Sequence, residues 1–267
     1  MQKNTPVSGA GAVATAIAAA AALALAGCGS SASSSSSSSS GASSSSSSSS
    51  SATNSATSPA ATSPGSSASV PFPVAVGDTW TYNTTAGGES GTTVNKMTAV
   101  TPVTGGQQVT MTNTDHLAGV NTSSTETYIF HSDGSISYPL GQLSAASGVT
   151  VSSGGIVWPP ASVIDSGTPT QSDIKLSIKE AGQAISTTAH VTVQGAGTAS
   201  VTVPAGTYQA TVVLITEQIS IAGVTATVQV KTWLAPNVGP VKDQVTTTDA
   251  GASTVAATEE LVSFTQG

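Results

Sequence analysis

Hydrophobic and polar side chains alternate with a period of two through the part of the chain that follows residue 70. In the stretch 224–234 the apolar positions are Val224, Ala226, Val228, Val230 and Leu234, and Thr, Gln and Lys fill most positions between them. The stretch 207–215 alternates in the same way. This pattern indicates strands with one buried face, and Ala222-Gly223 between the two stretches predicts a hairpin turn.

A second hairpin is predicted from residues 125–131 and 135–138, joined by a Ser132-Asp133-Gly134 turn. No window of 12 residues shows a capped helical stripe, and β-branched residues dominate. We therefore expect an all-β, antiparallel domain, either a sandwich or a strongly curved open sheet. The remaining predicted strands lie at 79–84, 92–100, 107–113, 173–179, 185–193, 197–203, 241–248 and 254–264.

The chain divides into three parts by composition. Residues 1–27 have the pattern of a signal peptide, 28–69 contain the only cysteine and a Ser-rich linker, and 70–267 form the predicted β domain. Within that domain, Asp165-Ser-Gly-Thr-Pro169 is the clearest break. Because each half has few large apolar side chains, we expect the break near 165–170 to separate two subdomains of one domain.

The N-terminus has the three regions of an export signal. Lys3 precedes an uncharged, Ala-rich stretch from Gly9 to Ala26, and small residues follow. The sequence Leu25-Ala26-Gly27-Cys28 resembles the lipobox of bacterial lipoproteins. The resemblance implies cleavage before Cys28 and lipidation of its thiol. It also implies an outer-membrane location where the source has two membranes, since Gly29 replaces the aspartate associated with inner-membrane retention.

Two other interpretations of this segment stay open. Ala24-Leu25-Ala26 also fits ordinary signal cleavage, which would release a soluble protein. A retained transmembrane helix would be short and only weakly hydrophobic. Lipidation is favoured because a single unpaired cysteine in an exported chain needs an explanation.

The linker from Ser30 to Ser69 is nearly all Ser, Ala, Thr, Gly and Pro, without charge. Such a segment has too little apolar area to offset the entropy of ordering, so we expect disorder. As a flexible coil it would span about 35 Å. A spacer role, a neutral low-complexity expansion and O-glycosylation of the serines all remain open.

The charge balance excludes some partners. The chain has no arginine, and loss of Lys3 with the signal leaves 5 basic against 13 acidic side chains, a net charge of −8. Phosphate contacts require a basic surface, so nucleic-acid binding is not expected. A polybasic membrane-surface site is excluded for the same reason.

Several local motifs in the β domain resemble a poorly characterised group of bacterial envelope proteins, the TapB-like domains. The motifs are Gly77-Asp-Thr-Trp80-Thr-Tyr82, Val203-Pro-Ala-Gly206-Thr-Tyr208, Trp233-Leu-Ala-Pro236-Asn-Val-Gly239-Pro-Val-Lys242 and Glu260-Leu-Val-Ser-Phe264. The resemblance implies an antiparallel β fold at the cell envelope, akin to curved sheets that cradle lipid, and it implies no catalytic residues.

These motifs also have a direct structural interpretation. Pro204-Ala-Gly206 predicts a tight corner, and Pro236 with Gly239 predicts a bulge or corner between strands. The large aromatic side chains are scarce, so we expect them to anchor the core rather than line a binding site. They are Trp80, Tyr82, Trp233 and Phe264.

Candidate catalytic and metal-binding residues are few. The histidines are His116, next to Asp115, His131, two residues before Asp133, and His190. None has the spacing of a zinc motif, and the chain contains no nucleophile elbow, P-loop or calcium loop. Adjacent Glu259 and Glu260 should point to opposite faces of a strand. We therefore expect no catalytic, cofactor or metal site, with Cys28 as the one modified residue.

The sequence favours a lipid-anchored envelope protein whose β domain is not an enzyme and binds or carries an apolar ligand or an envelope protein. A passive structural or adhesive surface domain is the main alternative, and it predicts no concave apolar pocket. A hydrolase is the third hypothesis, and it requires His116, His131 or His190 to meet a carboxylate in one cleft.

Overall fold

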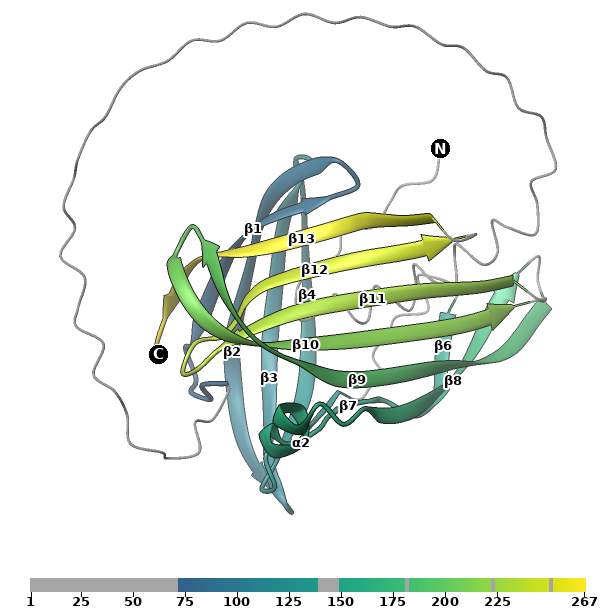
Figure 1. Cartoon of the computed structure of the whole chain (residues 1–267), viewed down its shortest axis with the longest axis horizontal. Helices are drawn as coiled ribbons and strands as arrows, with labels where there is room; N and C mark the ends of the chain where they lie inside the picture. The colour runs from purple at the N-terminus through teal and green to yellow at the C-terminus, as the bar shows by residue number, and fades with distance from the viewer. Residues whose placement is uncertain (1–71, 139–148, 181–182, 222–223, 250–251) are drawn as a thin grey trace, which may run out of the picture.

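The computed structural model describes residues 72–138, 149–180, 183–221, 224–249 and 252–267. They form one antiparallel sheet of 13 strands, in the order β6-β8-β9-β10-β11-β12-β13-β1-β2-β3-β4-β5-β7 (Figure 1). The first strands are β1 (Thr79–Ala86), β2 (Glu89–Val103), β3 (Gly106–Leu117), β4 (Val120–His131), β5 (Ile136–Tyr138), β6 (Val149–Ser153) and β7 (Ile156–Trp158). The later elements are α2 (Ala161–Ser166), β8 (Thr170–Glu180), β9 (Gln183–Val203), β10 (Gly206–Ile221), β11 (Val224–Ala235), β12 (Gly239–Asp249) and β13 (Ala252–Thr265).

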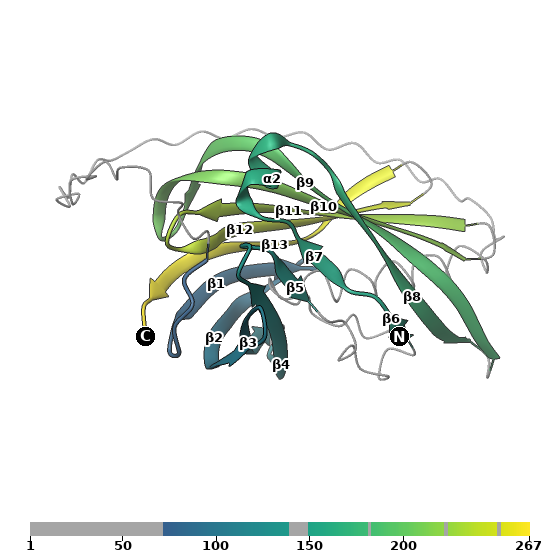
Figure 2. The same cartoon turned by 90° about the horizontal axis from the view of Figure 1, so that it is seen from below.

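The sheet is open and strongly curved. Strands β9–β13 form an arch, and β1–β4 turn beneath it, so that one face of the sheet becomes the inside of the fold (Figure 2). The two parts are joined where β13 pairs with β1 along the whole length of β1. Right-handed twist accumulates across many strands and brings the inner faces of the two parts toward each other.

Alternation along each strand selects the residues of the inner face. On β11, Ala226, Val228, Val230 and Leu234 are buried, and Ile215 and Ile219 of neighbouring β10 are buried beside them. The period of two places these side chains on one face. Burial of this face supplies most of the apolar core.

The structure confirms the predicted fold class, in the form of the curved open sheet. Every predicted strand outside the undescribed residues is present, although 185–193 and 197–203 are parts of one long strand, β9. The short strands β6 and β7 and the six-residue helix α2 were not predicted. The predicted break at Asp165–Pro169 is the end of α2, where Gly167 takes a φ of 68°. Strands on both sides of it belong to the same sheet.

The predicted turns are confirmed where they are described. Gly206 has a φ of 136° between β9 and β10, and Gly134 has a φ of 86° in the hairpin that follows β4. The corner at Pro236 is completed by Asn237 and Gly239, whose φ values are 60° and 89°. The Ala222-Gly223 turn, the signal segment, Cys28 and the Ser-rich linker lie outside the described residues.

Candidate functional site

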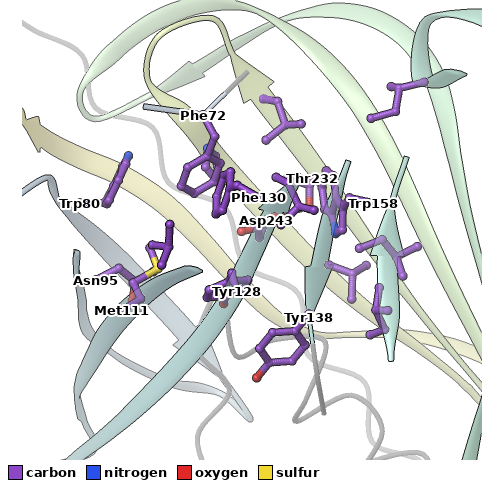
Figure 3. A pocket seen from close by; sticks show the side chains of 18 of the residues that line it. Phe72, Trp80, Asn95, Met111, Tyr128, Phe130, Tyr138, Trp158, Thr232 and Asp243 are labelled. Carbon is purple, nitrogen blue, oxygen red and sulfur yellow. Dashed lines mark hydrogen bonds between the residues drawn. The ribbon is translucent and has the colours of Figure 1, made fainter. Parts of the chain in front are cut away.

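A cavity of about 100 Å³ lies inside the curve of the sheet, several times the volume that one water molecule needs. Figure 3 shows its side chains, which come from strands far apart in sequence. One wall is formed from β1–β4 and Phe72, and the opposite wall from β10–β12. The walls include Trp80, Met97, Val109, Met111, Tyr128, Phe130, Ile215, Val230 and Leu234, and one end is lined by Ile136, Tyr138, Ile156, Trp158, Pro159 and Ile164.

Aromatic rings organise the cavity in two groups. The Phe72 ring lies 5.4 Å from Trp80 and 5.7 Å from Phe130, measured between centroids, and Trp80 stacks on Phe264 at 5.1 Å. Tyr128 and Tyr138 form a separate stacked pair at 4.9 Å. Such contacts hold the rings in fixed orientations, so the apolar lining is largely preformed.

The aromatic residues that the sequence predicts as core anchors include two that also line the cavity. Trp80 and Tyr82 are 1% and 2% exposed, which confirms them as core residues, yet both also line the cavity. Phe264 is partly buried against Trp80. Trp233 is also partly buried, and the Nζ atoms of Lys231 and Lys242 lie 4.6 and 5.8 Å from the centroid of its ring.

Helix α2 contributes Ile164 to the lining at one end of the cavity. The helix lies against β9 at Gly195, where a Cβ atom would overlap the carbonyl oxygen of Ile164. Glycine is therefore required at position 195 by the close approach of the two backbones. The helix follows Pro160 and ends before Gly167, whose φ of 68° is the left-handed conformation that glycine favours at a helix C-terminus.

Asp243 on β12 is the acidic group of the cavity wall. Its side chain is buried, and Thr232 Oγ1 donates a hydrogen bond of 2.5 Å to its carboxylate. Burial raises the pKa of Asp243 to about 7, against the lowering effect of the Thr232 hydrogen bond. The Tyr82 hydroxyl, also at the wall, donates to the Pro240 carbonyl at 3.0 Å.

A second acidic group lies beside the tyrosine pair. Tyr128 donates a 2.6 Å hydrogen bond to Glu126, and Tyr138 also hydrogen-bonds to this carboxyl. Burial raises the pKa of Glu126, although the tyrosine hydrogen bonds act in the opposite direction. The pKa of Tyr128 is raised by its own burial and by the charge of Glu126.

Polar side chains form a row across the inner face of seven strands. Strand register aligns Thr232 with Asp243, Asp243 with Glu259, and Glu259 with Thr84. The row continues through hydrogen bonds from Thr84 to Thr93 and from Thr93 to Asp115, both 2.8 Å long, and ends with a weaker contact from Thr122 at 3.4 Å. Sequence reasoning missed this row because its members lie on separate strands.

The three histidines do not come together. His116 contacts Asn121 at 2.6 Å and His131 contacts Ser137 at 2.8 Å, and these two histidines lie near opposite ends of the paired strands β3 and β4. His190 lies on β9 in an exposed pair with Asp173 at 2.8 Å. None of the three lines the cavity.

The adjacent glutamates point to opposite faces, as predicted. Glu259 is 3% exposed on the inner face, whereas Glu260 forms an ion pair with Lys242 at 2.7 Å. Within the described ranges, no three His, Cys, Asp or Glu side chains gather as a group that could hold a metal ion. The described part of the chain also contains no helix long and apolar enough to cross a membrane.

Comparison with known proteins adds a family to this geometry. A family model described as DUF3108-like matches residues 76–246, which include the strands of both cavity walls but not Phe72. The chain belongs to the DUF3108-like family. No curated protein matches this DUF3108-like chain.

Two solved structures resemble the DUF3108-like chain. One is a candidate lipoprotein from Parabacteroides distasonis, with a TM-score of 0.53 and 17% identity, covering 75% of this chain and 100% of its own. The other is a candidate exported protein from Bacteroides fragilis, described as having a YmcC-like fold. Its TM-score is 0.49 and its identity 20%, and the match covers 73% of this chain and 98% of that protein's chain. At 17% identity, the likeness to the P. distasonis protein shows a shared fold and nothing about function.

Proposed function

We propose that this DUF3108-like chain is an exported envelope lipoprotein, anchored through Cys28, whose β domain binds an apolar or amphipathic small molecule in the concave cavity. The observation that carries the proposal is the cavity itself, with walls of aromatic and aliphatic side chains. Concave, mostly apolar pockets with a few polar groups are the usual form of small-molecule sites. The TapB-like affiliation remains part of this proposal.

The anchor is supported by the Leu25-Ala26-Gly27-Cys28 motif at the end of an apolar stretch. One acyl chain binds a membrane marginally, and two or more hold it stably, so a lipoprotein cysteine would keep the domain at a membrane. The Ser-rich linker would then let the domain reach about 35 Å from its anchor. A ligand taken from or delivered to a membrane suits this arrangement.

The alternatives have less support. A passive structural domain predicts no concave apolar pocket, and the sheet encloses one. A hydrolase requires a histidine beside a carboxylate in a cleft, whereas the one His–Asp pair in the described residues, His190 with Asp173, is exposed outside the cavity. We therefore propose binding without catalysis.

The test uses the mature chain, residues 28–267, with Cys28→Ser so that no lipid or detergent is needed. The probe is N-phenyl-1-naphthylamine, a neutral dye whose fluorescence rises in an apolar site. Val230→Phe adds volume at the cavity wall, and Val255→Phe makes the same change at an exposed position. We expect saturable binding by the parent and by Val255→Phe, and at least about tenfold weaker binding by Val230→Phe.

Thermal unfolding of each variant separates a blocked cavity from a lost fold. If the parent chain gives no saturable rise in fluorescence, the cavity does not bind apolar molecules. Equal dye affinity in folded Val230→Phe and in the parent would place the binding elsewhere and would also contradict the proposal.

A further inference from the structure

The described lysines lie on one face of the sheet only, whereas carboxyl groups occur on both faces. On the strands, the inner, buried face carries five carboxyl groups, those of Asp115, Glu126, Glu217, Asp243 and Glu259, and buried Asp78 lies just before β1. Every lysine whose side chain is described is less buried and belongs to the outer face by strand alternation: Lys96, Lys175, Lys231 and Lys242. Among the described side chains, the interior is therefore acidic without a lysine to balance it.

Glu217 is a buried carboxyl on β10 without a hydrogen-bond partner among the described residues. Its side chain is 2% exposed, and neither carboxylate oxygen has a hydrogen-bond partner among the described residues. It lies on the inner face of β10 next to Ile215, which lines the cavity, and in register with Val228. A buried polar group without a partner is costly and rare in native proteins, and Glu217 is such a group next to the cavity wall.

Asp243 is a second buried carboxyl, and it lies in the cavity wall. Its one hydrogen-bond donor in the described part of the chain is Thr232, and its cross-strand neighbour on β13 is another acid, Glu259. Acidic residues directly opposite each other are destabilising unless something offsets their charge. The cavity thus combines an apolar aromatic wall with an acidic position.

We propose that the cavity takes an amphipathic ligand with a protonated amine, whose ammonium group pairs with the carboxylate of Asp243 while its alkyl part packs against the aromatic wall. The inference rests on the proposed function and adds the chemical class of the ligand. An anionic head group, such as that of a fatty acid, would be repelled by Asp243 and Glu259. A neutral head group would gain no charge-assisted hydrogen bond.

The pairing depends on pH because Asp243 must be ionised. The titratable groups that face Asp243 are Glu259 from β13, Tyr82 from β1 and Tyr128 from β4, whereas β11 contributes the uncharged Thr232. Glu259 is acidic and the two tyrosines stay neutral, so none of the three groups supplies a positive charge that would lower the pKa of Asp243. An alkylamine stays protonated up to about pH 10, and its affinity therefore rises as the pH rises through about 7, where Asp243 loses its proton.

The experiment compares three probes of equal chain length: n-octylammonium, n-octanol and octanoate. Each displaces N-phenyl-1-naphthylamine from the mature Cys28→Ser chain. At pH 8 we expect the affinity for n-octylammonium to be at least about tenfold higher than that for n-octanol, and we expect octanoate to bind most weakly. This preference falls to about threefold or less at pH 5.5, and in Asp243→Asn at pH 8. Asp173→Asn, at an exposed carboxyl, keeps it.

Glu217→Gln tests the wider acidic interior, and we expect a smaller loss of amine preference than in Asp243→Asn. Equal binding of n-octanol and n-octylammonium at pH 8 overturns the inference but leaves the proposed function intact, because the cavity still binds apolar chains. Failure of the dye and all three probes to bind overturns the proposed function. If Asp243→Asn does not fold, the pH series of the parent chain decides: a preference that is the same at pH 5.5 and 8 contradicts the pairing.

Discussion

Ionisation of Glu217 should destabilise the folded protein as the pH rises. Burial raises the pKa of this carboxyl from 4.5 to about 8, so the folded chain holds a proton that the unfolded chain releases above about pH 4.5. The contribution to stability is therefore fully present below pH 4.5 and is lost as the pH rises toward 8. A shift of this size corresponds to a loss of about 3 to 4 kcal/mol in the free energy of unfolding between pH 5 and pH 8.

Glu217→Gln removes the ionisation and keeps the shape of the side chain. The buried amide is also without a partner, which costs free energy equally at every pH, so the variant can be less stable at pH 5. At pH 8 it should be the more stable of the two, because the parent must bury a charge or take up a proton. Between pH 5 and pH 8 the variant should therefore lose less free energy of unfolding than the parent.

The assay is urea unfolding followed by tryptophan fluorescence at pH 5, 6, 7 and 8. Asp243 has the same sign of pH dependence, since its pKa is raised from 3.8 to about 7, but it is present in both proteins and cancels from their difference. Equal urea slopes are required for the comparison. The reasoning is refuted if the parent and Glu217→Gln lose the same free energy between pH 5 and pH 8.

Three further predictions concern Trp80, Gly195 and Cys28. Trp80→Phe removes the 2.6 Å hydrogen bond from Nε1 to the Val238 carbonyl and should lower the free energy of urea unfolding by about 1 to 3 kcal/mol; an unchanged value contradicts this role. Gly195→Ala should displace α2 from β9, with about 1 to 3 kcal/mol lost and weaker dye binding, whereas dye affinity equal to the parent's would show that α2 does not contribute to the site that binds the dye. In cells fed labelled palmitate, the parent chain should carry the label and Cys28→Ala should not; label on both would exclude Cys28 as the lipidation site.

The strands could be predicted because a half-buried sheet imposes a local period of two. On β11 that period places Val228 and Val230 inside and Lys231 outside, and each choice is visible within a few residues. The corner at Gly206 was predictable for a similar reason, since Pro204-Ala-Gly206 restricts the backbone locally.

The long strand β9 shows where local signals mislead. Gly195 and Gly197 interrupt the hydrophobic pattern and suggest two strands, but pairing with β10 continues across them with a register shift between Thr211 and Val213. Helix α2 was missed because six residues carry no periodic stripe. Its local signal was Gly167 after the last residue, the position that glycine favours at a helix C-terminus.

The candidate site could not be predicted, because it depends on register and curvature. Trp80, Tyr128 and Asp243 line the cavity from three strands and show no common spacing in the sequence. Only the pairing of neighbouring strands aligns Asp243 with Glu259, and only the curve of the sheet brings Met111 and Val230 to the same cavity. Neither property is encoded within a short window of residues.

The most direct test of the central claim is native mass spectrometry of the mature chain, produced in its own host with Cys28→Ser and purified without detergent or added ligand. We expect a fraction of the protein to carry a non-covalently bound small molecule that collisional activation releases, and we expect Val230→Phe to lack it. Bare masses for both proteins, or the same bound molecule on both, would contradict a ligand-binding cavity inside the curved sheet.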